Sequence, residues 1–106
     1  MGNAGDMKDL SRELEEAREG AQILKALAHP VRLCIARGLL RSGACNVTKM
    51  QACLGMPQST VSQHLSKLRD LGIVSARRQG VEVFYEVVHP AAIRVVEALF
   101  PGARTT

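Results

Sequence analysis

Small polar side chains with little charge among them are concentrated between residues 58 and 67. On a helix, Val61, Leu65 and Leu68 would share one face, and the opposite stripe would carry hydroxyl and amide groups instead of the Glu and Lys typical of a solvated helix. Gln pairs bidentately with adenine, and Ser and Thr bond bases or phosphates. The stripe therefore favours the major groove of duplex DNA over the alternative, a helix that is Ser-rich by chance. The predicted contacts are Gln58, Ser59, Thr60, Ser62, Gln63, His64 and Lys67.

Positive charge surrounds that segment. Residues 29–80 hold eight Lys and Arg side chains and a single carboxylate, Asp70, although the whole chain has a formal net charge of only +4. Such a basic middle is typical of a polyanion-binding protein, and a solvated basic face is the alternative. Arg77, Arg78 and Gln79 precede Gly80 at a predicted turn, where we expect them to reach phosphates or the minor groove. Charge that only aids solubility is the alternative for this site.

Three cysteines, Cys34, Cys45 and Cys53, are the other residues that could do chemistry. They form no C-x-x-C pair, so neither a zinc knuckle nor a thioredoxin-type site is indicated. On a continuous helix Cys45 and Cys53 would lie ~12 Å apart, too far for one metal ion to bridge, whereas their distance is undetermined if Cys45 lies in the turn before the helix. Three interpretations stay open: small apolar core residues, a thiol switch (oxidation, persulfide or disulfide), and a soft metal or metalloid at a non-standard site. The sequence names no cofactor.

The bulk properties predict one small domain. The chain has 106 residues, of which 46% are hydrophobic, so a disordered chain is excluded. No apolar run reaches the ~18–20 residues that span a bilayer, and the N-terminus does not resemble a signal peptide, so we expect a cytoplasmic protein. Aromatic residues make up only 3%, which argues against single-stranded nucleic acid because it is bound by stacking. No catalytic triad, carboxylate pair or phosphate loop is present, so we expect no enzyme.

Hydrophobic periodicity and helix breakers predict the elements that would position these groups. Helices are expected over residues 8–28, 31–41, 47–54, 58–71 and about 90–100, with a β-hairpin of residues 73–79 and 81–88. This order predicts a mainly α fold with a small β-hairpin, the winged helix-turn-helix (α-α-α-α-β-β-α). The domain is expected over residues 8–101, after a flexible N-terminus of residues 1–7.

The first predicted helix carries a long apolar stripe. Its members recur at spacings of three and four residues: Leu10, Leu14, Ala17, Ala21, Leu24 and Ala28. A chain this small has too little remaining core to cover such a stripe. We therefore predict a homodimer in which a partner chain covers it, aided by Ile93, Val96 and Phe100 of the last helix.

Three segments resemble the ArsR/SmtB family of bacterial repressors. They are residues 27–33 (LAHPVRL), residues 57–69 (PQSTVSQHLSKLR) and residues 72–85, which include the Arg-Arg-Gln-Gly turn. The resemblance covers roughly residues 20–100. It implies a recognition helix over 58–71 and a homodimer built through the first and last helices, with operator half-sites about one DNA turn apart. Pro57 departs from the Ser that is common at its position, so an N-cap hydroxyl is lost.

Many members of that family release DNA when a metal or metalloid binds. The two cysteines of the best-known site correspond to Asn46 and Thr48 here, and the Asp-x-His of a second site corresponds to residues 89–91, His-Pro-Ala. Both standard metal sites are therefore expected to be absent. We predict a sequence-specific repressor whose release from double-stranded DNA is controlled by a thiol event or a soft metal at its cysteines. The alternative is a non-sensing architectural or protein-interaction DNA-binding module, in which Lys and Arg would be expected on the polar stripe.

Overall fold

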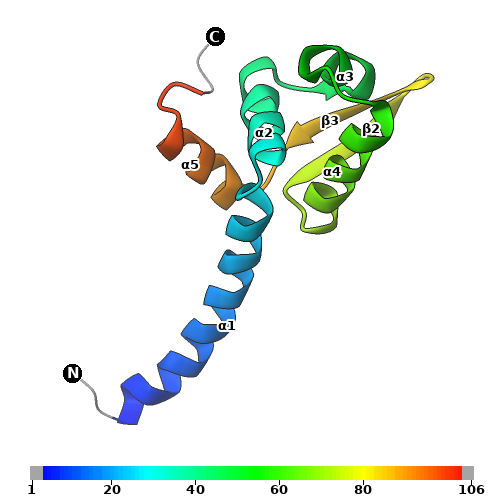
Figure 1. The fold of residues 1–106 in the computed structure, drawn as a ribbon. Coiled ribbons are helices and arrows are strands. Elements are labelled where there is room, and N and C mark those ends of the chain that lie inside the picture. The colour runs from blue at the N-terminus through cyan, green and yellow to red at the C-terminus, as the bar shows by residue number, and fades with distance from the viewer. Residues whose placement is uncertain (1–3, 104–106) are drawn as a thin grey trace.

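The computed structural model describes residues 4–103, which form five helices and three strands (Figure 1). The helices are α1 (Ala4–Leu27), α2 (Pro30–Ser42), α3 (Val47–Leu54), α4 (Gln58–Asp70) and α5 (Pro90–Leu99). The strands are β1 (Cys45–Asn46), β2 (Val74–Gln79) and β3 (Glu82–Val87). The four helices, the β2–β3 hairpin and the last helix follow in the predicted order, so the winged helix-turn-helix is confirmed.

Local signals in the sequence set the helix boundaries. The Nδ1 atoms of His29 and His89 each accept a hydrogen bond of 3.1 Å from the backbone N–H two residues on, ahead of α2 and α5. The Oδ1 atom of Asn46 caps α3 by accepting from the N–H three residues on at 2.8 Å. Gly55 ends α3 in the left-handed conformation (φ +66°). Pro57 precedes α4 without a side-chain cap, as its departure from Ser predicts.

The core lies where α2, α4, α5 and the end of α1 meet. Its largest fully buried side chains come from α4, the segment that follows it, and α5: Leu65, Leu68, Ile73, Val61 and Val96. Val96 is 0% exposed within its own chain, so the prediction that it helps to cover a partner is wrong. The alanine and valine side chains of α5 at 92 and 96 pack inward, whereas Leu99 is 56% exposed.

The sheet contains a third strand that the sequence did not predict. Strand β1 pairs antiparallel with β3, which gives the order β1-β3-β2, with Cys45 opposite Tyr85 and Asn46 opposite Phe84. Two residues are too few to show the alternation that identifies a strand, so only the tertiary pairing reveals it. The turn into α3 is thereby attached to the hairpin.

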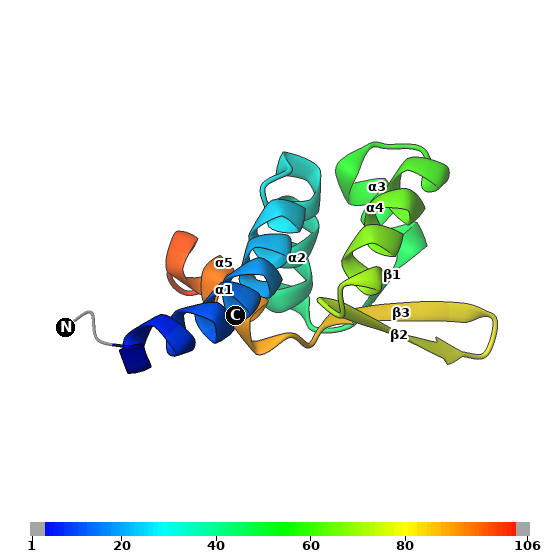
Figure 2. The same ribbon diagram turned by 90° about the horizontal axis from the view of Figure 1, so that it is seen from below.

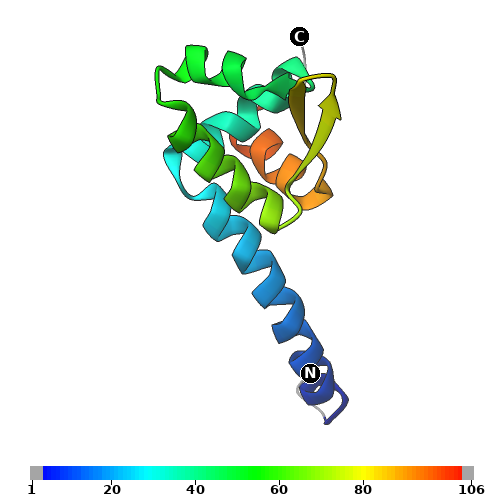
Figure 3. The same ribbon diagram turned by 90° about the vertical axis from the view of Figure 1, so that its right-hand side faces the viewer.

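Helix α1 projects from the body (Figures 1 and 3). It begins at Ala4, four residues before the predicted start at Lys8; no proline interrupts residues 4–7, although Gly5 and Asp6 are poor helix formers. Residues 1–3 of the predicted flexible segment lie outside the described residues. From Asp9 onward, only Ile23, Ala26 and Leu27 of α1 are buried. Among residues 4–103, no helix combines the length and the hydrophobicity that a bilayer crossing requires.

Candidate DNA-binding surface

Helix α4 has two chemically different faces. Val61, Leu65 and Leu68 are 0%, 1% and 0% exposed, which confirms the predicted inward face. The predicted DNA contacts lie elsewhere on the helix: Gln58, Ser59, Gln63 and Lys67 are exposed, and Thr60, Ser62 and His64 are half-buried. The exposed face can therefore present two amides, a hydroxyl and an ammonium group to a ligand, while the apolar face holds the helix on the body.

The hairpin carries the second predicted group of contacts. Arg77, Arg78 and Gln79 are exposed and run into the turn at Gly80, whose φ of +67° suits glycine. Within residues 4–103, neither arginine pairs with a carboxylate. Helix α4 and the hairpin lie at the end of the molecule opposite α1 and α5 (Figure 2). Both predicted contact groups are thus on the same part of the molecule.

His64 contacts residues of its own chain. Its Nδ1 atom lies 3.4 Å from Nη1 of Arg32, and its ring centroid lies 4.6 Å from that of His29. Arg32 is fixed in turn, because its Nε donates a hydrogen bond of 2.7 Å to the carbonyl oxygen of Ala26. His64 therefore links α4 to the start of α2 and the end of α1. A DNA contact by His64 stays a prediction, and the contacts within the chain give it a supporting role.

The surroundings of His64 favour its neutral form. Burial lowers the pKa of His64 below its ordinary value of 6.5, and the nearby His29, Arg32 and Lys67 lower it further. A neutral ring can accept the Arg32 N–H on Nδ1, whereas a protonated ring cannot. The unfolded chain thus binds this proton at a higher pH than the folded chain does. The contribution of His64 to stability is therefore fully present above its ordinary pKa of 6.5. It is lost as the pH falls from there through the lower pKa of the folded chain.

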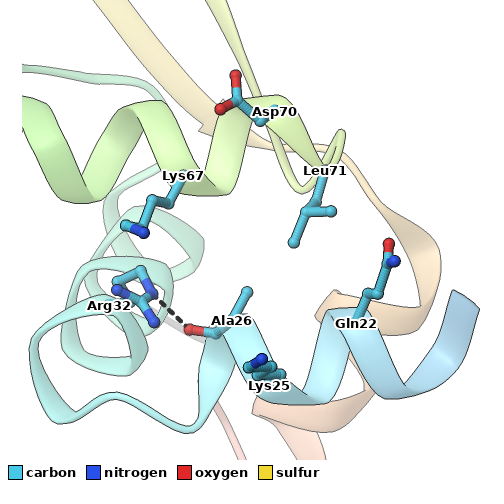
Figure 4. A pocket seen from close by; sticks show the side chains of 7 residues that line it. All are labelled: Gln22, Lys25, Ala26, Arg32, Lys67, Asp70 and Leu71. Carbon is cyan, nitrogen blue, oxygen red and sulfur yellow. Dashed lines mark hydrogen bonds between the residues drawn. The ribbon is translucent and has the colours of Figure 1, made fainter. Parts of the chain in front are cut away.

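Cations also gather beneath α4. Lys25, Arg32 and Lys67 line a cavity of about 280 Å³ between α1, α2 and α4, together with Asp70 and three further residues. Figure 4 shows Lys67 reaching from α4 toward Arg32, while the carboxylate of Asp70 points away from both. Two of these cations, Arg32 and Lys67, are among the groups that lower the pKa of His64.

The three cysteines lie on three elements that border one cavity. Cys34 on α2 and Cys53 on α3 are exposed, Cys45 in β1 is half-buried, and all three are free thiols. All three line one cavity of about 380 Å³ between α2 and α3. Nevertheless, the part of the chain that the structure describes holds no group of three or more His, Cys, Asp or Glu side chains able to bind one metal ion.

Sequence reasoning missed several polar contacts around this surface. Arg32 was counted only as positive charge, although it joins α1, α2 and α4. Nδ2 of Asn46 donates to Oε1 of Glu82, so the cap of α3 also contacts the hairpin. Arg37 lies 4.0 Å from the ring centroid of Phe100. An asparagine at a predicted helix start is a recognisable cap signal, whereas His64 and Phe100, the side-chain partners of Arg32 and Arg37, are distant in sequence and gave no signal.

Known proteins that are similar to this chain identify its family. The family model described as "Bacterial regulatory protein, arsR family" matches residues 29–76. The transcriptional repressor PagR of Bacillus anthracis is 39% identical over 84% of this chain and 89% of its own length. The chain belongs to the ArsR family. Its resemblance to the ArsR/SmtB repressors is thus confirmed, and so is the prediction of a regulator and not an enzyme.

Other relatives agree with this assignment. The biofilm growth-associated repressor of Agrobacterium fabrum is 42% identical over 81% of this chain and 73% of its own length. The crystal structure of PagR matches with a TM-score of 0.75, at 38% identity, over 81% of this chain and 98% of that one. A winged helix-turn-helix DNA-binding domain from Mycobacterium bovis, described as homodimeric, matches with a TM-score of 0.73, at 31% identity, over 83% and 81% of the two chains.

Proposed function

We propose that this ArsR-family protein is a homodimeric repressor that binds a specific double-stranded operator in the cytoplasm. The observation that carries this proposal is the exposed face of α4, where Gln58, Ser59 and Gln63 offer amide and hydroxyl groups. Amides of Gln read adenine in the major groove, and small hydroxyl side chains let a helix approach the bases closely. Lys67 at the edge of this face is suited to a phosphate.

The hairpin supplies contacts that do not depend on sequence. Arg77 and Arg78 project from β2 beside the Gly80 turn, free of carboxylate partners within the described residues. Guanidinium groups in such a position can bind phosphates or enter a narrow minor groove, and Gln79 adds a neutral donor. In this proposal α4 determines the sequence specificity, and the hairpin increases the affinity by contacting the flanking DNA backbone.

The dimer is supported by the exposed apolar side of α1. Leu10, Leu14 and Leu24 are 55%, 53% and 55% exposed in the single chain, and Leu99 of α5 is 56% exposed. Exposed leucines in such a row favour a second chain as their cover. The Mycobacterium bovis relative is described as homodimeric, which supports the same arrangement here. A two-fold dimer would present two α4 helices to half-sites about one DNA turn apart.

We also propose that the cysteines control release from DNA. Cys34, Cys45 and Cys53 share one cavity, which favours chemistry at these thiols over three separate core positions. A soft metal or metalloid has less support, because residues 4–103 hold no group of three or more suitable side chains around one point. A thiol event is therefore the favoured inducer.

Selection from a random duplex library tests the DNA-binding proposal. The purified protein should enrich a two-half-site sequence and bind it at least about 1,000-fold more tightly than a scrambled duplex at the same salt concentration. Binding of similar strength to every duplex would overturn sequence-specific repression and favour the architectural module. Reporter repression from the enriched site then tests the regulatory role.

A further inference from the structure

The cavity between α2 and α3 has a chemical character that the DNA-binding surface does not use. It is lined on the α2 side by Cys34, Leu39 and Arg41, and its other wall includes Cys45 of β1 and Lys49 and Cys53 of α3. Leu39 is 2% exposed, so the floor is apolar, whereas Arg41 and Lys49 are exposed at the opening. A volume of about 380 Å³ falls in the range of small-molecule sites.

The charges at this cavity favour a ligand with an anionic group. Within residues 4–103, neither Arg41 nor Lys49 forms an ion pair. Two uncompensated cations beside an apolar floor attract a molecule that has an anionic group and an apolar body. A bare metal cation would be repelled by them, and the described residues offer it no cluster of three ligands.

We propose that this cavity is an effector site that captures small organic electrophiles carrying an apolar body and an anionic group. The thiolate sulfur of a cavity cysteine attacks the alkene carbon of an α,β-unsaturated carbonyl compound. A C–S bond forms as the C=C π bond breaks, and the resulting enolate takes a proton from water in place of the proton that the thiol released. No oxidant or reductant is needed, and the product is a stable thioether.

The cavity borders the elements that hold the recognition helix and the hairpin. Cys34 belongs to α2, in the body, whereas Cys53 belongs to α3, which packs against the recognition helix α4. Cys45 belongs to β1, which pairs with β3 of the hairpin. We expect a molecule bound covalently between α2 and α3 to change how these helices pack, because it occupies space that the side chains of both leave open. A difference in affinity between two such arrangements is what couples an effector to DNA release. Only this coupling rests on the proposed function, because capture itself does not involve DNA.

Two maleimides that differ in one charged group test capture. We compare N-(4-carboxyphenyl)maleimide with neutral N-phenylmaleimide on the reduced protein and map the adducts by peptide mass spectrometry. The anionic reagent should modify the cavity thiols about 5-fold faster or more, after correction for the rates of both reagents with a free thiol. The Arg41→Gln/Lys49→Gln variant should lose this preference. The Arg69→Gln/Arg94→Gln variant loses the same charge outside the cavity and should keep it.

Operator binding tests the coupling separately. The adduct should weaken operator binding about 10-fold or more. A Cys34→Ser/Cys45→Ser/Cys53→Ser variant should bind the operator with the same affinity in the presence and absence of the reagent. Circular dichroism checks that each variant is folded. Equal rates for the two reagents, or the same preference in Arg41→Gln/Lys49→Gln, would overturn capture. Full modification without loss of operator affinity would overturn the effector role. Failure of the unmodified protein to prefer any operator would instead overturn the proposed function, and the rate comparison would still decide capture.

Discussion

The exposed leucines of α1 allow the dimer to be tested quantitatively with Leu14→Ala. Leu14 is 53% exposed in the single chain, and full burial of a leucine side chain is worth about 1.5–3 kcal/mol. Covering the exposed half therefore contributes about 0.8–1.6 kcal/mol per chain, and both chains of a two-fold dimer lose it in the variant. At about 1.4 kcal/mol for each factor of ten, the dimer dissociation constant should rise by about 10-fold to about 200-fold.

Sedimentation equilibrium over a wide concentration range measures this change. Glu16→Ala is the matched control, because it introduces the same residue about 200° around the helix, away from the leucine stripe. Leu14→Glu should have a stronger effect, since it would place an unpaired carboxylate in the interface. Equal dissociation constants for Leu14→Ala and Glu16→Ala would refute the role of this stripe. A wild-type monomer of 11.5 kDa that binds a palindromic operator tightly would refute the dimer itself.

Three further predictions concern the DNA-binding surface. Gln63→Ala should cost about 1–3 kcal/mol on the selected operator and almost nothing on random duplex in a titration, and equal losses on both would exclude base readout by this side chain. Arg77→Ala with Arg78→Ala should weaken every duplex and flatten the log–log salt dependence by about one unit for each lost phosphate contact; an unchanged slope would place both arginines off the DNA. The wild-type melting temperature should fall between about pH 7.5 and about pH 5.5 more than that of His64→Gln, because the lowered pKa of His64 makes protonation favour the unfolded chain. Parallel pH profiles for the two proteins would contradict that account.

The sequence was most informative where local signals determine the structure. Helix α3 was predicted at residues 47–54, and the structure has these bounds, because Asn46 caps one end and Gly55 ends the other. The buried face of α4 also followed from spacing alone, since residues three and four apart share one side of a helix. Helix α4 carries most of the candidate surface. The family resemblance and the residue pattern therefore agreed on its location.

Features that depend on contacts between distant segments could not be predicted. His64 lies beside the polar stripe in a helical projection, yet its direction is set by Arg32, more than thirty positions earlier. Val96 was assigned to a partner because periodicity shows that a face is apolar and does not show which chain covers it. Strand β1 and the common cavity of the three cysteines likewise arise only when α2, α3 and β3 come together.

Asn46 explains how the two halves of the DNA-binding surface are held together. Its Oδ1 accepts the N–H of Lys49 at the start of α3, and its Nδ2 donates to Glu82 of the hairpin. Its backbone also pairs with β3 opposite Phe84. Asn46 is thus one of the points at which the helix-turn-helix contacts the hairpin, and a cavity of about 380 Å³ lies between α3 and α2. Helix α2 lines this cavity together with α3 and also packs against β3, so the cavity borders elements that contact both α3 and the hairpin. A change at the cysteine cavity would then alter both sets of DNA contacts at once.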